Sequence, residues 1–199
     1  MSGEETQAKG ADGARRAKLW LDATTRVNVR WVNPEKHAVR KLTFEWADGS
    51  EPFSFDLGGI LLGEDLEGQE FFAECKKYAN AYDQGKHYRK YLAQCYRALH
   101  LRPERCDNFM WITWAPFDVT VWEELLSAKR VRQAVLEHSA KVLNEPRKEQ
   151  AESLVSEEMC EDVSDRLWMI VLSDRQERLT LTREHLAVIR HHDTIEGRL

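Results

Sequence analysis

Two strand-like runs joined by a short polar loop constrain the fold of this chain more than any other feature. The runs extend from Phe53 to Leu62 and from Glu70 to Tyr78, and glycines bound the loop between them. This pattern is typical of an antiparallel hairpin. If the hairpin is centred on Asp65, Asp56 lies directly opposite Glu74, because each is nine residues from the centre.

The predicted register brings three charged side chains together. Directly paired residues of an antiparallel hairpin have Cβ atoms about 4.5–5.5 Å apart. Alternation along the second run puts Glu74 and Lys76 on one face and Cys75 on the other. Two carboxylates this close repel each other unless a cation lies between them. We therefore expect Asp56, Glu74 and Lys76 to converge on one exposed spot.

This spot has the groups that phosphodiester hydrolysis requires. Two carboxylates can hold Mg²⁺ (or Mn²⁺), a hard cation that prefers oxygen ligands, and the carbonyl of Cys75 is a further candidate ligand. Lys76 can orient or deprotonate a water, or offset the charge that develops on the phosphate. Gly58 and Gly59 lack side chains where a backbone could approach a phosphate.

The segments before the hairpin predict a tail, a strand and a short helix. Residues 1–17 contain mainly glycine, alanine and charged residues, which indicates a disordered tail. Alternation between Val27 and Trp31 predicts a strand. Asn33 can cap a short helix that begins at Pro34 and ends near Arg40. A further strand, from Lys41 to Trp46, would complete a three-strand meander through the turn at 47–50.

The segments after the hairpin alternate between helix and strand. Apolar residues recur with helical spacing over 85–101, and the run 109–117 indicates a buried strand. A capping box at Thr120 predicts a long helix to about Leu143. A polar linker follows over 144–150, the apolar run 167–172 could be a strand or a helix turn, and Thr182 can cap a last helix.

This order predicts an α/β (α+β) protein with a mixed sheet flanked by helices. We expect three parts: a disordered tail over 1–17, a core domain over 18–145, and a C-terminal extension over 146–199 that packs on the core as a small strand and helix layer.

The residues of the hairpin resemble the PD-(D/E)XK nuclease superfamily. The similar segments are Phe55-Asp56-Leu57-Gly58-Gly59 and Glu74-Cys75-Lys76, within a stretch from about Asn33 to Leu143. The resemblance implies a restriction-endonuclease-like core, metal-binding roles for Asp56 and Glu74, and a catalytic role for Lys76. Phe55 stands where the family has proline. The resemblance also suggests an acidic ligand on the first helix, for which Glu35 is the candidate and Glu45 the next, and a polar residue on the helix after the lysine, Gln94 or Tyr88.

The charge distribution suggests where a nucleic acid would bind. The chain carries a net charge of −5, yet residues 76–105 carry +6, so the remainder carries −11. Local fields rather than the total charge attract a polyanion. Candidate contacts to DNA phosphates are the basic residues of this block beside the hairpin, namely Lys77, Lys86, Arg89, Lys90 and Arg97.

The four cysteines and the N-terminal sequence bear on location. No C-x-x-C pair is present, the N-terminal residues lack the apolar stretch of a secretion signal, and no apolar run is long enough to cross a membrane. We therefore expect a cytoplasmic protein whose thiols are reduced.

Two functions from different classes fit these features. The first is a Mg²⁺-dependent nuclease that cleaves DNA, with RNA as a less favoured substrate; by analogy with small stand-alone nucleases it would serve prokaryotic antiviral defence or repair. The alternative is a catalytically inactive, nuclease-like subunit that binds or assembles a larger complex. Expected partners are DNA, a second copy of the chain, and a partner ATPase, helicase or sensor protein.

Overall fold

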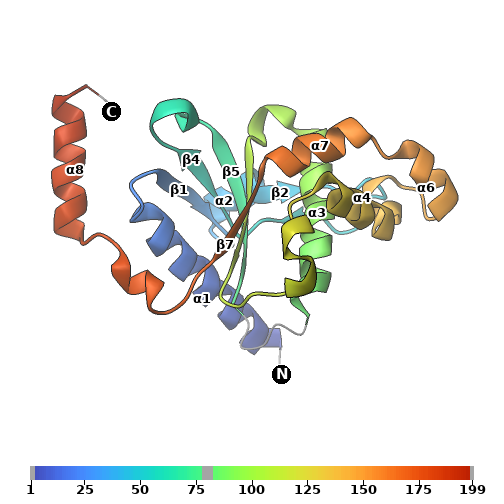
Figure 1. The fold of residues 1–199 in the computed structure, drawn as a ribbon, viewed down its shortest axis with the longest axis horizontal. Helices are drawn as coiled ribbons and strands as arrows, with labels where there is room; N and C mark the ends of the chain where they lie inside the picture. The colour runs from blue at the N-terminus through green and yellow to red at the C-terminus, as the bar shows by residue number, and fades with distance from the viewer. Residues whose placement is uncertain (1–2, 78–82, 198–199) are drawn as a thin grey trace.

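The main sheet of the protein has five strands. The computed structural model describes residues 3–77 and 83–197, residues 3–10 by backbone alone. In spatial order the strands are β1 (Val27–Val32), β4 (Leu57–Leu61), β5 (Glu70–Lys76), β6 (Asn108–Thr113) and β7 (Leu167–Val171). β1, β4 and β5 are antiparallel, whereas β5, β6 and β7 are parallel (Figure 1). This mixed sheet with flanking helices confirms the α/β class.

Helices cover both faces of the sheet. One face carries α1 (Gly3–Asp22); the other carries α2 (Lys36–Leu42) and α3 (Gln84–Leu101), and α4 (Ala128–Glu137) and α7 (Glu157–Asp165) pack on α3. The remaining α-helices are α5 (Ser139–Val142), α6 (Lys148–Leu154) and α8 (Arg183–Ile195). The 3₁₀ turns are η1 (Glu64–Leu66), η2 (Pro103–Arg105), η3 (Val119–Glu124) and η4 (Gln176–Leu179). No helix within the described ranges is long and apolar enough to cross a membrane.

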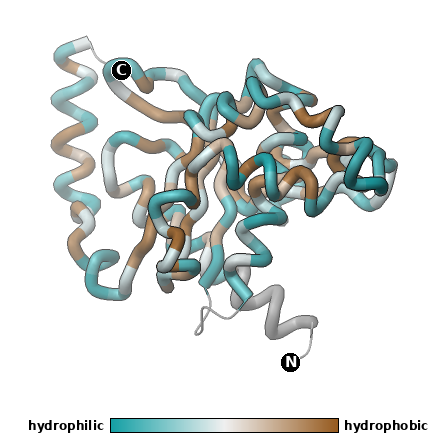
Figure 2. Tube along the Cα trace, turned by 45° about the vertical axis from the view of Figure 1, so that its right-hand side comes forward, coloured by the Kyte–Doolittle hydropathy of each residue, from teal (hydrophilic) through white to brown (hydrophobic). Residues whose placement is uncertain are grey.

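Two hydrophobic clusters hold the layers together. The smaller one joins α1 to the sheet through Ala14, Ala17 and Leu21, which contact the face of β5 that carries Phe71, Ala73 and Cys75. The larger one fills the space between the sheet, α2, α3, α4 and α7. Hydrophobic stretches accordingly concentrate in the strands at the centre of the molecule (Figure 2). All four cysteines are buried and free, which agrees with the expected reduced thiols.

The hairpin of β4 and β5 has the register that the sequence predicts. Leu57 pairs with Ala73 and Gly58 with Phe72, so the next residues outward are Asp56 and Glu74. Its loop contains η1, and Gly63 and Gly68 at its ends both have positive φ. The helix predicted over 85–101 and the last helix capped by Thr182 are also confirmed. The buried strand predicted over 109–117 is confirmed in its first part, because β6 ends at Thr113. Of the apolar run 167–172, residues 167–171 form β7, an outer strand of the main sheet.

The N-terminal segment was predicted wrongly as a disordered tail. Residues 3–22 form α1, and the side chains of Ala14 and Ala17 are buried against the sheet. Ion pairs also tie the helix down, since Lys77 contacts Asp12 and Arg16 contacts Glu177. Small residues separated by charges have the composition of a disordered segment, but here they fit closely against a sheet that lies elsewhere in the sequence.

The meander was predicted with the wrong first strand. The neighbour of β4 is β1, whereas residues 43–44 form β2, which pairs only with β3 (Phe53–Ser54) in a separate two-stranded sheet. Residues 55–56 separate β3 from β4, so the first predicted run is two strands. The helix near Pro34 starts later than predicted, with Glu35 rather than Asn33 at its cap.

The long helix predicted from Thr120 is also absent. Residues 119–124 form the 3₁₀ turn η3, in which Val121 has non-helical dihedral angles, and α4 begins at Ala128. Ser127 caps α4 by accepting a hydrogen bond from the N–H of Arg130. Two short helices, α4 and α5, therefore replace the predicted single one, because the chain has a second and better placed cap.

Gly58 and Gly59 serve packing between strands rather than the proposed approach to a phosphate. A Cβ atom on Gly59 would lie 2.2 Å from the carbonyl oxygen of Asn28 in β1, and one on Gly58 would lie 2.9 Å from a methyl group of Leu42. Both glycines are buried. They allow β1 and α2 to approach β4 closely, which no local pattern could indicate.

We expect Gly59→Ala to lower the free energy of unfolding by about 3 kcal/mol, because its methyl group would collide with backbone rather than a movable side chain. Urea denaturation monitored by circular dichroism measures this change. Gly68→Ala is the control: Gly68 has positive φ but open space around it, so the expected loss is only about 1 kcal/mol. Equal losses in the two variants would contradict the role assigned to Gly59.

Candidate metal and phosphate site

Asp56 lies where the chain enters β4, fixed by backbone contacts to β5. Its N–H donates to the carbonyl oxygen of Ala73 at 3.0 Å, and its own carbonyl oxygen accepts from the N–H of Asn33 at 2.9 Å. The carboxylate Oδ2 accepts a hydrogen bond of 2.9 Å from the N–H of Cys75. The Asp56 carboxylate therefore lies against the segment of β5 that carries Glu74.

Glu74 and Lys76 lie on the same face of β5, as predicted. Their side chains form an ion pair with 2.6 Å between Nζ of Lys76 and Oε1 of Glu74. Lys76 exposes 21% of its side-chain area and Glu74 exposes 14%. The expectation of an exposed spot is wrong, because the three groups are largely buried. The reason is topological: β5 and β6 are parallel, so α3 must cross over the sheet between them and covers this face.

Negative charge at this position is poorly compensated. Burial and the neighbouring Glu74 carboxylate raise the pKa of Asp56 to about 7, although Lys76 and the N–H of Cys75 oppose the shift. Lys76 thus neutralises Glu74 through the ion pair, but the pKa of Asp56 stays above its usual value. An additional cation between the two carboxylates would relieve this repulsion.

The donor set at this site fits Mg²⁺ better than a softer metal. It offers carboxylate oxygens, while the Cys75 side chain is buried on the opposite face of β5 among apolar residues. Within residues 3–77 and 83–197, no three His, Cys, Asp or Glu side chains cluster as metal ligands. A two-carboxylate site leaves several coordination positions to water, which is usual for Mg²⁺.

The other residues that the resemblance suggested, two acidic candidates and Tyr88, make contacts outside this cluster or are exposed. The Glu35 side chain is exposed and contacts His37, with 3.3 Å between Oε2 and Nε2, and Glu45 is exposed. Tyr88 is buried and its hydroxyl donates to the carbonyl oxygen of Leu125 at 2.8 Å. The ligand role of the Cys75 carbonyl stays a prediction.

The predicted phosphate contacts divide into two groups. Lys77 pairs with Asp12, and the Nε atoms of Arg89 and Arg97 donate to Glu137 and to the carbonyl oxygen of Glu45. Lys86 and Lys90, by contrast, are exposed and lie one turn apart near the N-terminal end of α3. These two lysines are therefore the better candidates for contact with a polyanion.

Several residues near the site were missed by the sequence reasoning. Burial and the charge of Lys76 lower the pKa of His87, whose half-buried side chain on α3 also senses Glu74. The hydroxyl of Thr113 lies 3.1 Å from the carbonyl oxygen of Lys76 and 2.8 Å from Oε1 of the fully buried Gln84. This contact joins the end of β5 to the first turn of α3. The parallel register of β5 and β6 positions Thr113, and no local pattern predicts that register.

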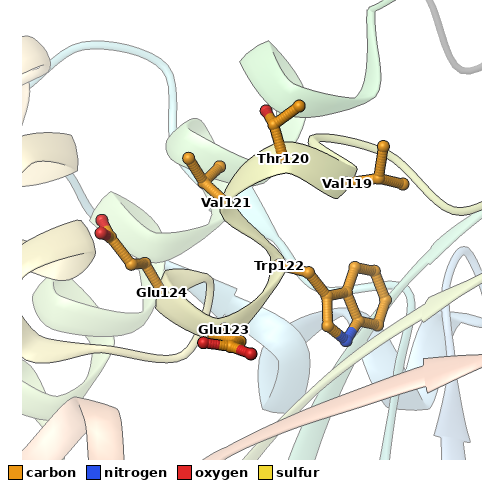
Figure 3. Close-up of a pocket in the computed structure, with 6 residues that line it drawn as sticks. All are labelled: Val119, Thr120, Val121, Trp122, Glu123 and Glu124. Atoms are coloured by element: carbon orange, nitrogen blue, oxygen red, sulfur yellow. The ribbon is translucent and has the colours of Figure 1, made fainter.

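Two surface hollows of the described chain lie away from these residues. One is lined by the consecutive residues 119–124 of η3, and the other by residues of the α1 end and of η4. In the first, the side chains of Val119, Thr120, Trp122 and Glu124 point in different directions rather than toward a common centre (Figure 3). Neither hollow therefore has the convergent polar groups of a binding site. Tyr78, the last residue of the second predicted run, lies outside the described residues.

We expect Asp56→Asn to stabilise the metal-free protein increasingly as the pH rises. The unfolded chain releases this proton near pH 4, whereas folded Asp56 holds it up to about pH 7, so the wild type loses stability across this range. The asparagine side chain can still accept from the N–H of Cys75. The difference in melting temperature between variant and wild type should grow by several degrees, about 2–4 °C per kcal/mol, from pH 5 to pH 8.

Asp48→Asn provides a control of opposite sign. Hydrogen bonds from Ser50 hold the pKa of exposed Asp48 below its usual value, so its removal cannot add stability as the pH rises. Thermal unfolding of both variants in EDTA, followed by circular dichroism, measures the effect. A pH-independent difference for Asp56→Asn would contradict the proposed electrostatic environment.

Comparison of the chain with protein-family models, with curated proteins and with solved structures finds no match.

Proposed function

We propose that the protein is a Mg²⁺-dependent nuclease that hydrolyses DNA, with its site at Asp56, Glu74 and Lys76. The observation that carries the proposal is the hydrogen bond from the N–H of Cys75 to the Asp56 carboxylate. It holds Asp56 beside Glu74 in a partly buried site, where ionisation of Asp56 is disfavoured. Such an arrangement is costly unless a cation occupies it.

The order of the elements supports the same proposal. The chain forms α1, the antiparallel strands β1, β4 and β5, then α3 and the parallel strand β6. The PD-(D/E)XK resemblance implies a helix, a three-strand meander, a helix, a strand and a helix, expected within about 33–143. The helix and first strand that fit this order in the structure, α1 and β1, precede that stretch. Here α2, β2 and β3 are inserted between the first and second strands of the meander.

Each residue of the site has a chemical role in the proposed reaction. Asp56 and Glu74 would hold Mg²⁺, which when bound polarises the phosphate and lowers the pKa of a water. The N–H of Cys75 keeps the Asp56 carboxylate oriented. Lys76 is held by its ion pair at the position where it could orient the attacking water or stabilise the charge that develops on the phosphate. Lys86 and Lys90 would contact the DNA backbone.

The catalytically inactive binding subunit remains the second candidate. Two observations favour it: Lys76 is engaged with Glu74, and the described residues supply no third acidic or histidine ligand. In this function the basic face of α3 would bind nucleic acid without cleavage. Antiviral defence, repair, and an ATPase, helicase or sensor partner stay hypotheses that the sequence raised by analogy.

We expect the wild-type protein to cleave plasmid DNA with Mg²⁺ and not with EDTA. Glu74→Gln and Lys76→Met should each lower the rate at least about 100-fold, because each removes a group that acts on the reacting phosphate or its water. Glu70→Gln is a matched control on the same strand, since Glu70 pairs with Arg105 at the other end of β5. It should retain cleavage.

Melting temperature with and without Mg²⁺ separates the two candidate functions. Mg²⁺ should raise the melting temperature of the wild type and of Lys76→Met, but not that of Glu74→Gln. Stabilisation by Mg²⁺ without cleavage of DNA or RNA would favour the binding subunit. Absence of both effects in a folded wild-type protein would refute the metal site.

We expect Lys86→Ala with Lys90→Ala to weaken DNA binding at every sequence. With each lysine releasing about one counterion, the slope of log affinity against log salt should fall by roughly 2. Fluorescence anisotropy with a labelled duplex measures this in an Asp56→Asn background. Arg147→Ala with Lys148→Ala, exposed at the start of α6, is the charge-matched control and should leave the slope unchanged.

A further inference from the structure

A second basic segment lies outside the block of residues 76–105. Residues 30–41 contain four basic residues and one acidic residue, which gives a net charge of +3 with histidine neutral. The acidic residue, Glu35, contacts the side chain of His37. The four basic side chains are all exposed, and they are Arg30, Lys36, Arg40 and Lys41. This segment therefore presents positive charge to the solvent at a second place on the chain.

Lys36 and Arg40 lie one turn apart on the outer face of α2. The inner face carries Ala38 and Leu42, which are fully buried in the larger hydrophobic cluster. In the part of the chain that the structure describes, neither Lys36 nor Arg40 has a carboxylate partner. Lys41 differs, because its Nζ lies over the ring of Trp31. Lys36 and Arg40 are therefore the charges of this segment that an external anion can reach.

α2 and α3 both begin at the end of the sheet that carries the candidate metal site. β1 ends at Val32, which pairs with Leu57, the residue after Asp56. β5, the antiparallel neighbour of β4, ends at Lys76. α2 is the next element after β1, α3 is the next element after β5, and both contribute to the larger cluster on one face of the sheet. The two helices therefore flank the site on the same face.

Backbone contacts fix α2 on the Asp56 side of the site. The N–H of Asn33 donates to the carbonyl oxygen of Asp56 at 2.9 Å, and Lys36 follows Asn33 by three residues. Three residues span at most about 11 Å. Successive phosphates of one DNA strand advance about 3.4 Å along the duplex axis, so this span corresponds to roughly three nucleotides. A duplex at the site would therefore pass close to Lys36.

The contacts of Thr113 fix α3 on the Lys76 side. Its hydroxyl lies 3.1 Å from the carbonyl oxygen of Lys76 and 2.8 Å from Oε1 of Gln84, the first residue of α3. Lys86 is in the same first turn, and Lys90 is one turn further along. In the strand order β1-β4-β5-β6, α2 packs on β1 and β4, whereas α3 connects β5 to β6. The two pairs of basic side chains thus lie on opposite sides of the site.

We propose that Lys36 and Arg40 form a second DNA-binding arm, which contacts backbone phosphates on the side of the site opposite to Lys86 and Lys90. A single duplex would then cross the site and be held on both sides of the cleaved bond. The second arm rests on the proposed function, because it requires DNA to occupy the site between the two helices. Its contacts are to phosphates, so they add affinity without sequence preference.

Fluorescence anisotropy with a labelled duplex in EDTA tests the second arm without requiring metal or cleavage. We expect Lys36→Ala with Arg40→Ala to lower the slope of log affinity against log salt by roughly 2, because two phosphate contacts are lost. When Lys86→Ala and Lys90→Ala are added, the fall should reach roughly 4, with one duplex bound per protein throughout. Circular dichroism should show that the helix content is unchanged.

The matched control is Arg175→Ala with Arg178→Ala. Both arginines are exposed at η4, which contacts α1 on the other face of the sheet through Glu177. This variant removes the same charge and should leave the slope unchanged.

Photo-cross-linking tests whether α2 touches the DNA directly. All four native cysteines are buried, so a thiol introduced by Lys36→Cys can be labelled selectively with a photoreactive azide. We expect it to capture the duplex as efficiently as Lys86→Cys does, whereas Arg175→Cys should capture little.

Four results would each overturn the second arm. They are an unchanged slope in the α2 variant, an equal fall in the η4 control, a second duplex bound per protein, and no duplex binding by the folded wild type. Binding through both arms without cleavage in Mg²⁺ would support the second arm and refute the nuclease alone.

Discussion

The pairing of β4 with β5 is the contact on which both the fold and the candidate site depend. It fixes Leu57 opposite Ala73, and thereby sets which residues of β5 face α1 and which face α3. A shift by one residue would turn Phe71 and Cys75 away from α1 and bury Glu74 and Lys76 in their place. The apolar residues that stabilise the sheet therefore also determine that two carboxylates lie side by side.

The sequence predicts this pairing because the information is local. The hairpin loop is short and glycines mark its ends. Aromatic residues alternate with polar ones over 53–56, and small apolar residues alternate with charged ones over 73–76. The neighbour of β4 on its other edge could not be predicted in the same way. β1 precedes β4 by more than twenty residues, and its close approach depends on the absence of side chains at Gly58 and Gly59. The burial of Ala14 and Ala17 in α1 likewise depends on a surface that distant segments build.

The same distinction explains which site residues were found. Asp56, Glu74 and Lys76 follow from the hairpin register and the alternation of β5. His87, Gln84 and Thr113 approach the end of β5 only because α3 crosses over the sheet and β6 pairs parallel to β5. This crossover also explains why the site is partly buried rather than exposed, and hence why burial raises the pKa of Asp56. Tertiary packing thus changes the chemistry of residues whose positions are locally determined.

The charges at the site suggest how the proposed metal and Lys76 would share their roles. With both acids ionised, Asp56, Glu74 and Lys76 together carry one net negative charge, which disfavours the approach of a phosphate. A divalent cation would change the net charge of the site to one positive charge. It would also weaken the ion pair between Lys76 and Glu74, because the metal would bind the Glu74 carboxylate. The ammonium group could then interact with the phosphate or the attacking water. The ion pair between Lys76 and Glu74 in the metal-free protein is therefore compatible with a catalytic role for the lysine. A divalent cation bound to the Glu74 carboxylate would replace the ammonium group as its partner.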